Sequence, residues 1–163
     1  MHEYGPCPSC DGEITEDSDF CPHCGILFEK KIRVPCDTHS QGQAVGVCIL
    51  CRALLCHECV HTKGGRRFCS EHRNVKVEQD WALIFQSNDI NEAELVRSFL
   101  ESISQQLILR NFTPHGFVWD GGGDSLFSRQ AVNRPAKLFV PIPDYVGARK
   151  ALEEWEAAGQ VEG

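Results

Sequence analysis

The ten cysteines of this 163-residue chain all lie between Cys7 and Cys69, and none follows. Each of them is separated by two residues from another cysteine or from a histidine. A short segment cannot bury enough apolar surface to offset the conformational entropy lost on folding, and a bound metal ion can make up the difference. We therefore expect small metal-stabilised modules up to residue 77 and an ordinary apolar core over residues 78–163.

The rest of the composition favours a reducing compartment. Residues 1–6 lack the basic and apolar regions of a secretory signal, and no apolar run approaches the ~20 residues that span a bilayer. We expect a cytoplasmic protein without a membrane segment, in which clustered thiols act as metal ligands rather than as disulfides. The 23 Asp and Glu residues outnumber the 16 Lys and Arg residues, and this acidic balance speaks against a protein that coats nucleic acid.

The first candidate site is formed by two Cys-Pro-x-Cys turns with ten residues between them: Cys7, Cys10, Cys21 and Cys24. Four thiolates close the coordination sphere of a tetrahedral ion, which predicts a structural zinc site. Gly12 and Gly25 lie near these turns, where a glycine can adopt a positive φ without strain. Residues 1–29 resemble a short zinc ribbon, and the match is best over residues 5–28. Disulfides and a rubredoxin-like iron site are the alternatives, and His23 is expected to lie outside the ligand set.

The segment of residues 30–77 carries four further ligand pairs. In order they are Cys36 and His39, Cys48 and Cys51, Cys56 and Cys59, and Cys69 and His72. With the first site they make twelve ligands, enough for three four-coordinate zinc ions with no cysteine left over. The pairs close two sites either sequentially or interleaved, and the four residues between Cys51 and Cys56 leave little chain for separate sequential units. His57 and His61 are further imidazoles, and His61 is an alternative ligand for the last site.

The order and spacing of these pairs resemble a B-box zinc finger over about residues 33–76. In that family the pairs interleave as a cross-brace. The resemblance implies that one zinc ion is held by Cys36, His39, Cys56 and Cys59, and the other by Cys48, Cys51, Cys69 and His72. The chain departs from the family at the last pair, where many members have two histidines, and in the longer gap that precedes it.

The cysteine-free half has the patterns of an α+β domain. The apolar run 81–85 predicts a buried strand, Ser87–Asp89 predicts a helix N-cap, and the apolar spacing over 90–103 predicts an amphipathic helix. Two more strands are predicted at 107–109 and 137–142, and a last helix follows Asp144. Glycines and prolines mark 111–136 as a flexible connection. The predicted order is strand, helix, strand, strand, helix, with one sheet edge open for want of a fourth strand.

Residues 80–158 resemble a small family of prokaryotic signal-transducing proteins, whose fold is a ferredoxin-like or PII-like half sandwich. The stretches that carry the resemblance are Ser87-Asn88, Glu92–Val96, Leu100, Leu138–Pro141 and Ala148–Leu152. The family implies no catalytic residues for this chain.

These features predict a non-enzymatic zinc-binding adaptor or regulatory protein that acts through protein contacts. No acid, base and nucleophile come together in the sequence, and the glycine run 121–123 lacks the Lys-Ser/Thr of a phosphate-binding loop. The basic stretch 63–76 makes a nucleic-acid-binding regulator the main alternative. A ubiquitin-ligase-like factor is a weaker one, because no RING pattern of eight ligands precedes the finger. We expect a protein partner, and a homodimer through the open sheet edge.

Overall fold

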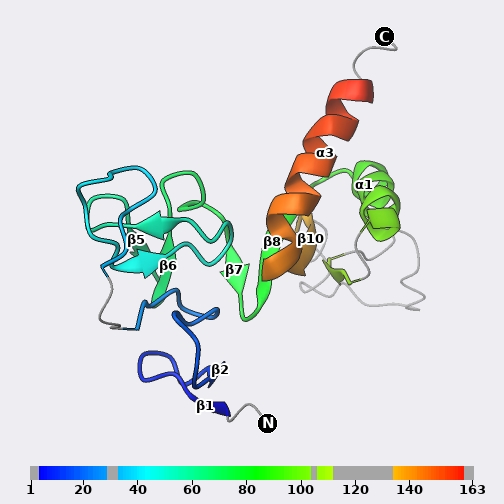
Figure 1. The fold of residues 1–163 in the computed structure, drawn as a ribbon. Coiled ribbons are helices and arrows are strands. Elements are labelled where there is room, and N and C mark those ends of the chain that lie inside the picture. Colours follow the sequence, from blue (N-terminus) through cyan, green and yellow to red (C-terminus); the bar gives the residue numbers. More distant parts are fainter. Residues whose placement is uncertain (1–3, 29–32, 104–105, 112–133, 160–163) are drawn as a thin grey trace. The chain divides into compact units, whose positions relative to one another are not determined.

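The computed structural model describes residues 4–28, 33–103, 106–111 and 134–159. The chain forms two compact units, Met1–Val75 and Lys76–Gly163 (Figure 1). Most of the predicted flexible connection, residues 112–133, lies outside the described residues. Within the described ranges, no helix combines the length and the apolar character needed to cross a membrane.

The first unit is built from very short antiparallel hairpins. Strand β1 (Tyr4–Pro6) pairs with β2 (Glu13–Thr15), β3 (Gly46–Val47) pairs with β4 (Leu54–Leu55), and β5 (His61–Lys63) pairs with β6 (Arg66–Phe68). Isolated hairpins of this length are not stable in water. The cysteine pairs lie in the turns and loops next to these strands, where a metal ion can hold them together.

The apolar core of the first unit is small and lies beside the ligands. Val47 and Leu55 are buried in it, whereas Val45 and Leu54 are half-buried. The buried side chains of Ile49, Leu50 and Phe68 complete most of the core. Phe68 directly precedes Cys69, so the core reaches the metal ligands without an intervening layer.

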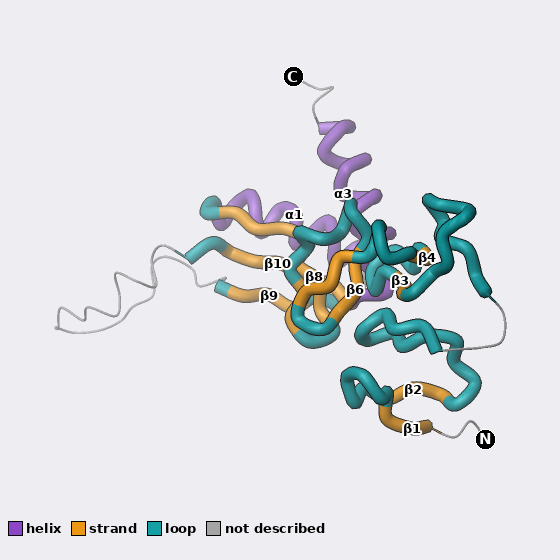
Figure 2. The backbone as a smooth tube through the Cα atoms, turned by 90° about the vertical axis from the view of Figure 1, so that its left-hand side faces the viewer, coloured by secondary structure: helices purple, strands orange, loops and turns teal. Residues whose placement is uncertain are grey.

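The second unit contains a four-stranded sheet in the order β7-β8-β10-β9 (Figure 2). Its strands are β7 (Val77–Glu78), β8 (Trp81–Ser87), β9 (Ile108–Arg110) and β10 (Ala136–Pro141). Both β8 and β9 run antiparallel to β10, so they are parallel to each other. Leu138 pairs with Phe85 and Phe139 with Leu83, which leaves Ile84 as a bulge in β8.

Two helices pack against β8 and β10 and against each other: α1 (Ile90–Ile103) and α3 (Tyr145–Gly159). The Asp89 carboxylate accepts a hydrogen bond from the Asn91 N–H at 2.8 Å, which caps α1 as the sequence predicts. The helices bury Ala93, Val96 and Leu100 from α1 and Tyr145, Ala148 and Leu152 from α3. Phe99 stacks on Trp155 with ring centroids 5.1 Å apart.

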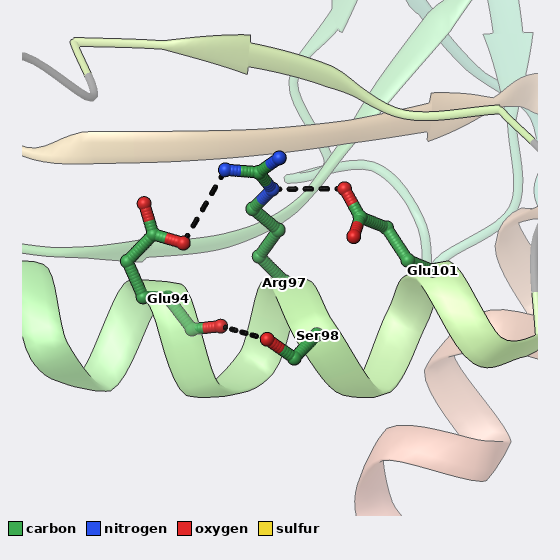
Figure 3. Close-up of polar contacts among 4 residues, drawn as sticks. All are labelled: Glu94, Arg97, Ser98 and Glu101. Atoms are coloured by element: carbon green, nitrogen blue, oxygen red, sulfur yellow. Dashed lines mark hydrogen bonds and ion pairs between the residues drawn. The ribbon is translucent and has the colours of Figure 1, made fainter.

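Short-range polar contacts link three side chains along one side of α1, Glu94, Arg97 and Glu101 (Figure 3). The Arg97 guanidinium pairs with Glu94 at 3.3 Å and with Glu101 at 2.8 Å, and the Ser98 hydroxyl donates to the Glu94 carbonyl at 2.9 Å. Val96 belongs to the buried stripe of α1, whereas Leu95 is 58% exposed. The two ion pairs of Arg97 are open to solvent, and each contributes at most a few tenths of a kcal/mol to the stability of the helix.

The predicted α+β class is confirmed, and the strands and helices expected between residues 81 and 155 occur in the expected chain order. Asp144 lies in a 3₁₀ turn, η1 (Ile142–Asp144), immediately before α3. The prediction of a three-stranded sheet was wrong, because β7 is a fourth strand that pairs with Trp81 and Ala82 at the outer edge of β8. A strand of two residues leaves no periodic pattern in a sequence. The ferredoxin-like family of this unit stays a prediction.

Candidate metal centres

The Cys-x-x-Cys turns of the first unit share one backbone geometry. In each, the N–H of the residue after the second cysteine donates to the carbonyl of the first: Asp11 to Cys7, Gly25 to Cys21, Arg52 to Cys48 and Val60 to Cys56, at 2.9–3.0 Å. The residue after the second cysteine has a positive φ in three of these turns: Asp11 (58°), Gly25 (75°) and Arg52 (66°). The sequence signal for this conformation, glycine, therefore identifies only one of the three.

The first centre consists of Cys7, Cys10, Cys21 and Cys24. The Sγ atoms of Cys7 and Cys24 are 3.9 Å apart, and those of Cys10 and Cys21 are 3.7 Å apart. Gly12 has no positive φ; its lack of a side chain instead leaves room for the His23 ring, which a Cβ would meet at 2.6 Å. His23 itself lies outside the ligand set, with Nε2 3.3 Å from the Glu13 carbonyl oxygen.

The second centre consists of Cys36, His39, Cys56 and Cys59. The His39 Nδ1 atom lies 3.4 Å from the Cys56 sulfur and 3.3 Å from the Cys59 sulfur. The His39 side chain is 47% exposed and lies 3.8 Å from the Glu58 carboxylate. Asp37, which the sequence did not single out, fixes the first turn by accepting the Leu54 N–H at 2.8 Å.

The third centre consists of Cys48, Cys51, Cys69 and His72. The Cys51 and Cys69 sulfurs are 3.8 Å apart, and the His72 Nδ1 atom lies 3.1 Å from the Cys69 sulfur. The structure thus groups residues 36–72 in the interleaved order that the B-box resemblance implies. His57 and His61 stand outside these sets.

The spacing of the donor atoms fits a tetrahedral ion. Four sulfurs at ~2.3 Å from a central zinc ion lie about 3.8 Å from one another. Four Sγ–Sγ distances within the centres, Cys7–Cys24, Cys10–Cys21, Cys36–Cys59 and Cys51–Cys69, are 3.7–3.9 Å, and all donor atoms of one centre lie within 4.8 Å of one another. A disulfide needs about 2.05 Å, so the ten cysteines are free thiols. Both zinc and iron suit four sulfurs at this spacing.

The pKa shifts of the thiols within one centre go in opposite directions, which disfavours ionisation of the whole set. In the third centre, a hydrogen bond from Cys51 lowers the pKa of Cys48 to about 4, and the neighbouring Cys48 thiolate raises the pKa of Cys51. In the first centre, burial raises the pKa of Cys21 to about 12. For Cys7, burial is outweighed by the backbone N–H groups of Ser9 and Cys10, and the pKa falls to about 7. A divalent ion removes this conflict, because it stabilises every thiolate of the set.

Among its described residues, the second unit forms a pocket. Its pocket of about 620 Å³ lies where the end of α1 meets η1 and the first turns of α3. The lining consists of apolar and small residues together with Gln106 and Asp144, and contains no Cys, Ser or His side chain. His115 and Asp120, the polar groups of the predicted loop, lie outside the described residues.

Comparison of this chain with models of known protein families, with curated proteins and with solved structures finds no match.

Proposed function

We propose that the first unit binds three zinc ions and that the chain is a non-enzymatic adaptor or regulatory protein. The observation that carries the proposal is the closure of each centre by four Cys or His donors at tetrahedral spacing. Such closed sites leave no open position for substrate or water, which is typical of structural rather than catalytic zinc. Zinc fits better than iron at the second and third centres, because a set of three thiolates and one imidazole is a frequent structural zinc site.

The adaptor role follows from what the zinc ions fix. In a unit with so few buried apolar side chains, the metal determines the shape of the surface, and that surface is what a partner recognises. The B-box and signal-transducing resemblances agree with contacts to another protein in the cytoplasm. At the sheet edge of the second unit, β7 pairs only with the first part of β8, so the edge over Phe85–Ser87 is proposed to accept a strand from a partner or a second copy.

Metal content tests the first half of this proposal. We expect elemental analysis of the purified chain to find close to three zinc ions, and the His39→Ala chain to lose one of them. His57→Ala is the matched control, because His57 is exposed, lies between two ligands of the second centre and belongs to no centre. A content of one ion or none contradicts the ligand assignment, and iron in place of zinc contradicts the metal.

Affinity capture tests the second half. The zinc-loaded full chain should retain a protein from the native cell, and a full chain with the Cys56→Ser substitution should retain less of it if the finger surface is the contact. Retention of nucleic acid instead supports the alternative regulator. That alternative has one structural observation in its favour, since Lys63, Arg66 and Arg67 lie on one hairpin. Contacts to phosphate must weaken steeply between low and high salt.

A further inference from the structure

We propose that the first and third metal centres are energetically coupled, so that the zinc ribbon retains its ion as part of the finger and not as an independent module. The proposal rests on the proposed zinc function. It concerns a junction formed by Cys24 and Gly25 of the ribbon with Val47, Ile49 and Arg67 of the finger. All of these residues belong to the same compact unit.

The junction is made by backbone hydrogen bonds. The Cys24 carbonyl accepts the Arg67 N–H at 3.0 Å and one N–H of the Arg67 guanidinium at 3.4 Å. The Gly25 carbonyl accepts the Val47 N–H at 2.8 Å, and Ile26 forms an isolated bridge with Gly46. One metal ligand, Cys24, is thus hydrogen-bonded directly to the finger through its own peptide group.

The finger residues that receive the ribbon also carry ligands of the third centre. Val47 is followed by Cys48, and Arg67 is two residues before Cys69. The Ile49 N–H donates to the Arg67 carbonyl at 3.0 Å, which ties these two segments together. A displacement of the ribbon therefore moves the backbone that positions Cys48 and Cys69, two of the third centre's four ligands. Conversely, loss of the third ion loosens the finger backbone to which the Cys24 carbonyl is hydrogen-bonded.

Two glycines allow the close approach on which the junction depends. A Cβ on Gly25 would lie 2.1 Å from the Val47 carbonyl oxygen, and a Cβ on Gly46 would lie 2.4 Å from the Arg67 side chain. The contact at Gly25 is with backbone, which cannot rotate away. By contrast, Gly65 has almost the same φ (74° against 75°) and nothing within 4 Å of its Cβ position. Gly65→Ala is therefore a control that reproduces the backbone strain of Gly25→Ala without the clash.

Charge adds to the coupling. A zinc ion with four thiolates carries a net charge of −2, and one with three thiolates and an imidazole carries −1. The Arg67 guanidinium lies at the junction of the two centres, and the Arg52 guanidinium, next to Cys51, lies 5.3 Å from the centroid of the Phe20 ring of the ribbon. Both guanidinium groups belong to the finger and contact the ribbon, and positive charge beside an anionic zinc centre favours its filled state.

Cysteine alkylation during zinc removal tests the coupling. The zinc-loaded full chain is mixed with a chelator and an alkylating reagent, and peptide mass spectrometry then gives the labelling rate of each cysteine. We expect cysteines of the first and third centres to be labelled at one common rate. In Gly25→Ala the third-centre cysteines should be labelled ~10-fold to 100-fold faster, the range expected when a few hydrogen bonds couple two sites. Gly65→Ala should leave the rates unchanged.

A second variant covers the case in which Gly25→Ala damages its own turn. Arg67→Ala changes only the finger, and coupling is reciprocal, so it should speed labelling of Cys7 and Cys21 by at least about 5-fold. Lys63→Ala, an exposed change in the same hairpin, should have no effect. The coupling is overturned if Gly25→Ala leaves the third centre unchanged and Arg67→Ala leaves the first unchanged. A starting chain with one zinc ion or none instead contradicts the proposed function.

Discussion

Removal of the metal is expected to unfold the first unit and to leave the second folded. Structural zinc contributes on the order of 10 kcal/mol per site, whereas each fully buried aliphatic or aromatic side chain contributes about 1.5–3 kcal/mol. The first unit has only a handful of such side chains, among them Ile49, Leu55 and Phe68. The second unit holds α1 with 14 residues and α3 with 15 residues, and has none of the twelve proposed ligands.

Two measurements on one chelated sample check this expectation. Far-UV circular dichroism should keep its helical signal, because the described helices all lie in the second unit. Hydrogen exchange read by mass spectrometry should show loss of protection for residues 4–75 and retained protection in β8, β10 and α3. Loss of the helical signal together with the zinc would refute the independence of the second unit. Protected amides in the first unit after complete chelation would refute the idea that metal holds it together.

Three further outcomes are expected. Leu152→Ala, at a side chain with no exposed surface, should lower the free energy of unfolding of the second unit by about 2–5 kcal/mol in calorimetry, with the zinc content unchanged. Asp89→Ala removes the cap of α1 and should cost about 1 kcal/mol in the same assay, and Asp89→Asn should restore most of it. Zinc binding at neutral pH should release protons, because the pKa of Cys21 is raised to about 12 by burial and that of Cys59 is raised to about 11 by burial and its neighbours. Zinc affinity should therefore fall as the pH falls, and calorimetric titrations in buffers of different ionisation enthalpy will show the proton release.

Ligand type and spacing carried most of the information about the metal centres. Pairs separated by two residues fold into one local turn each, and such turns depend little on the rest of the chain. The grouping of the four later pairs needed the B-box resemblance, because spacing alone left a sequential arrangement open. The positive φ of Asp11 and Arg52 could not be predicted, because the turn imposes on these residues a backbone conformation that only glycine adopts without strain.

The contacts between ribbon and finger were beyond sequence reasoning for a different reason. They are backbone hydrogen bonds between segments about 20 to 40 residues apart, and the peptide group is the same at every position. Gly46 offered no turn pattern, and Arg67 was singled out only as part of the basic stretch 63–76. In the second unit, the spacing of apolar residues and the N-cap residues predicted α1 and α3, whereas β7 was missed because it has only two residues.

The interleaved ligand order has a consequence for how the chain reaches this structure. Four successive cysteines of the chain, Cys48, Cys51, Cys56 and Cys59, have enough thiols to coordinate one ion by themselves. In the folded unit, however, they belong to two different centres. During synthesis this run is complete before Cys69 and His72 have been added. An ion captured early by these four thiols would have to move to one of the two centres once the last pair has been synthesised. The rate at which zinc is supplied and exchanged thus enters the folding kinetics of this protein alongside its amino-acid sequence.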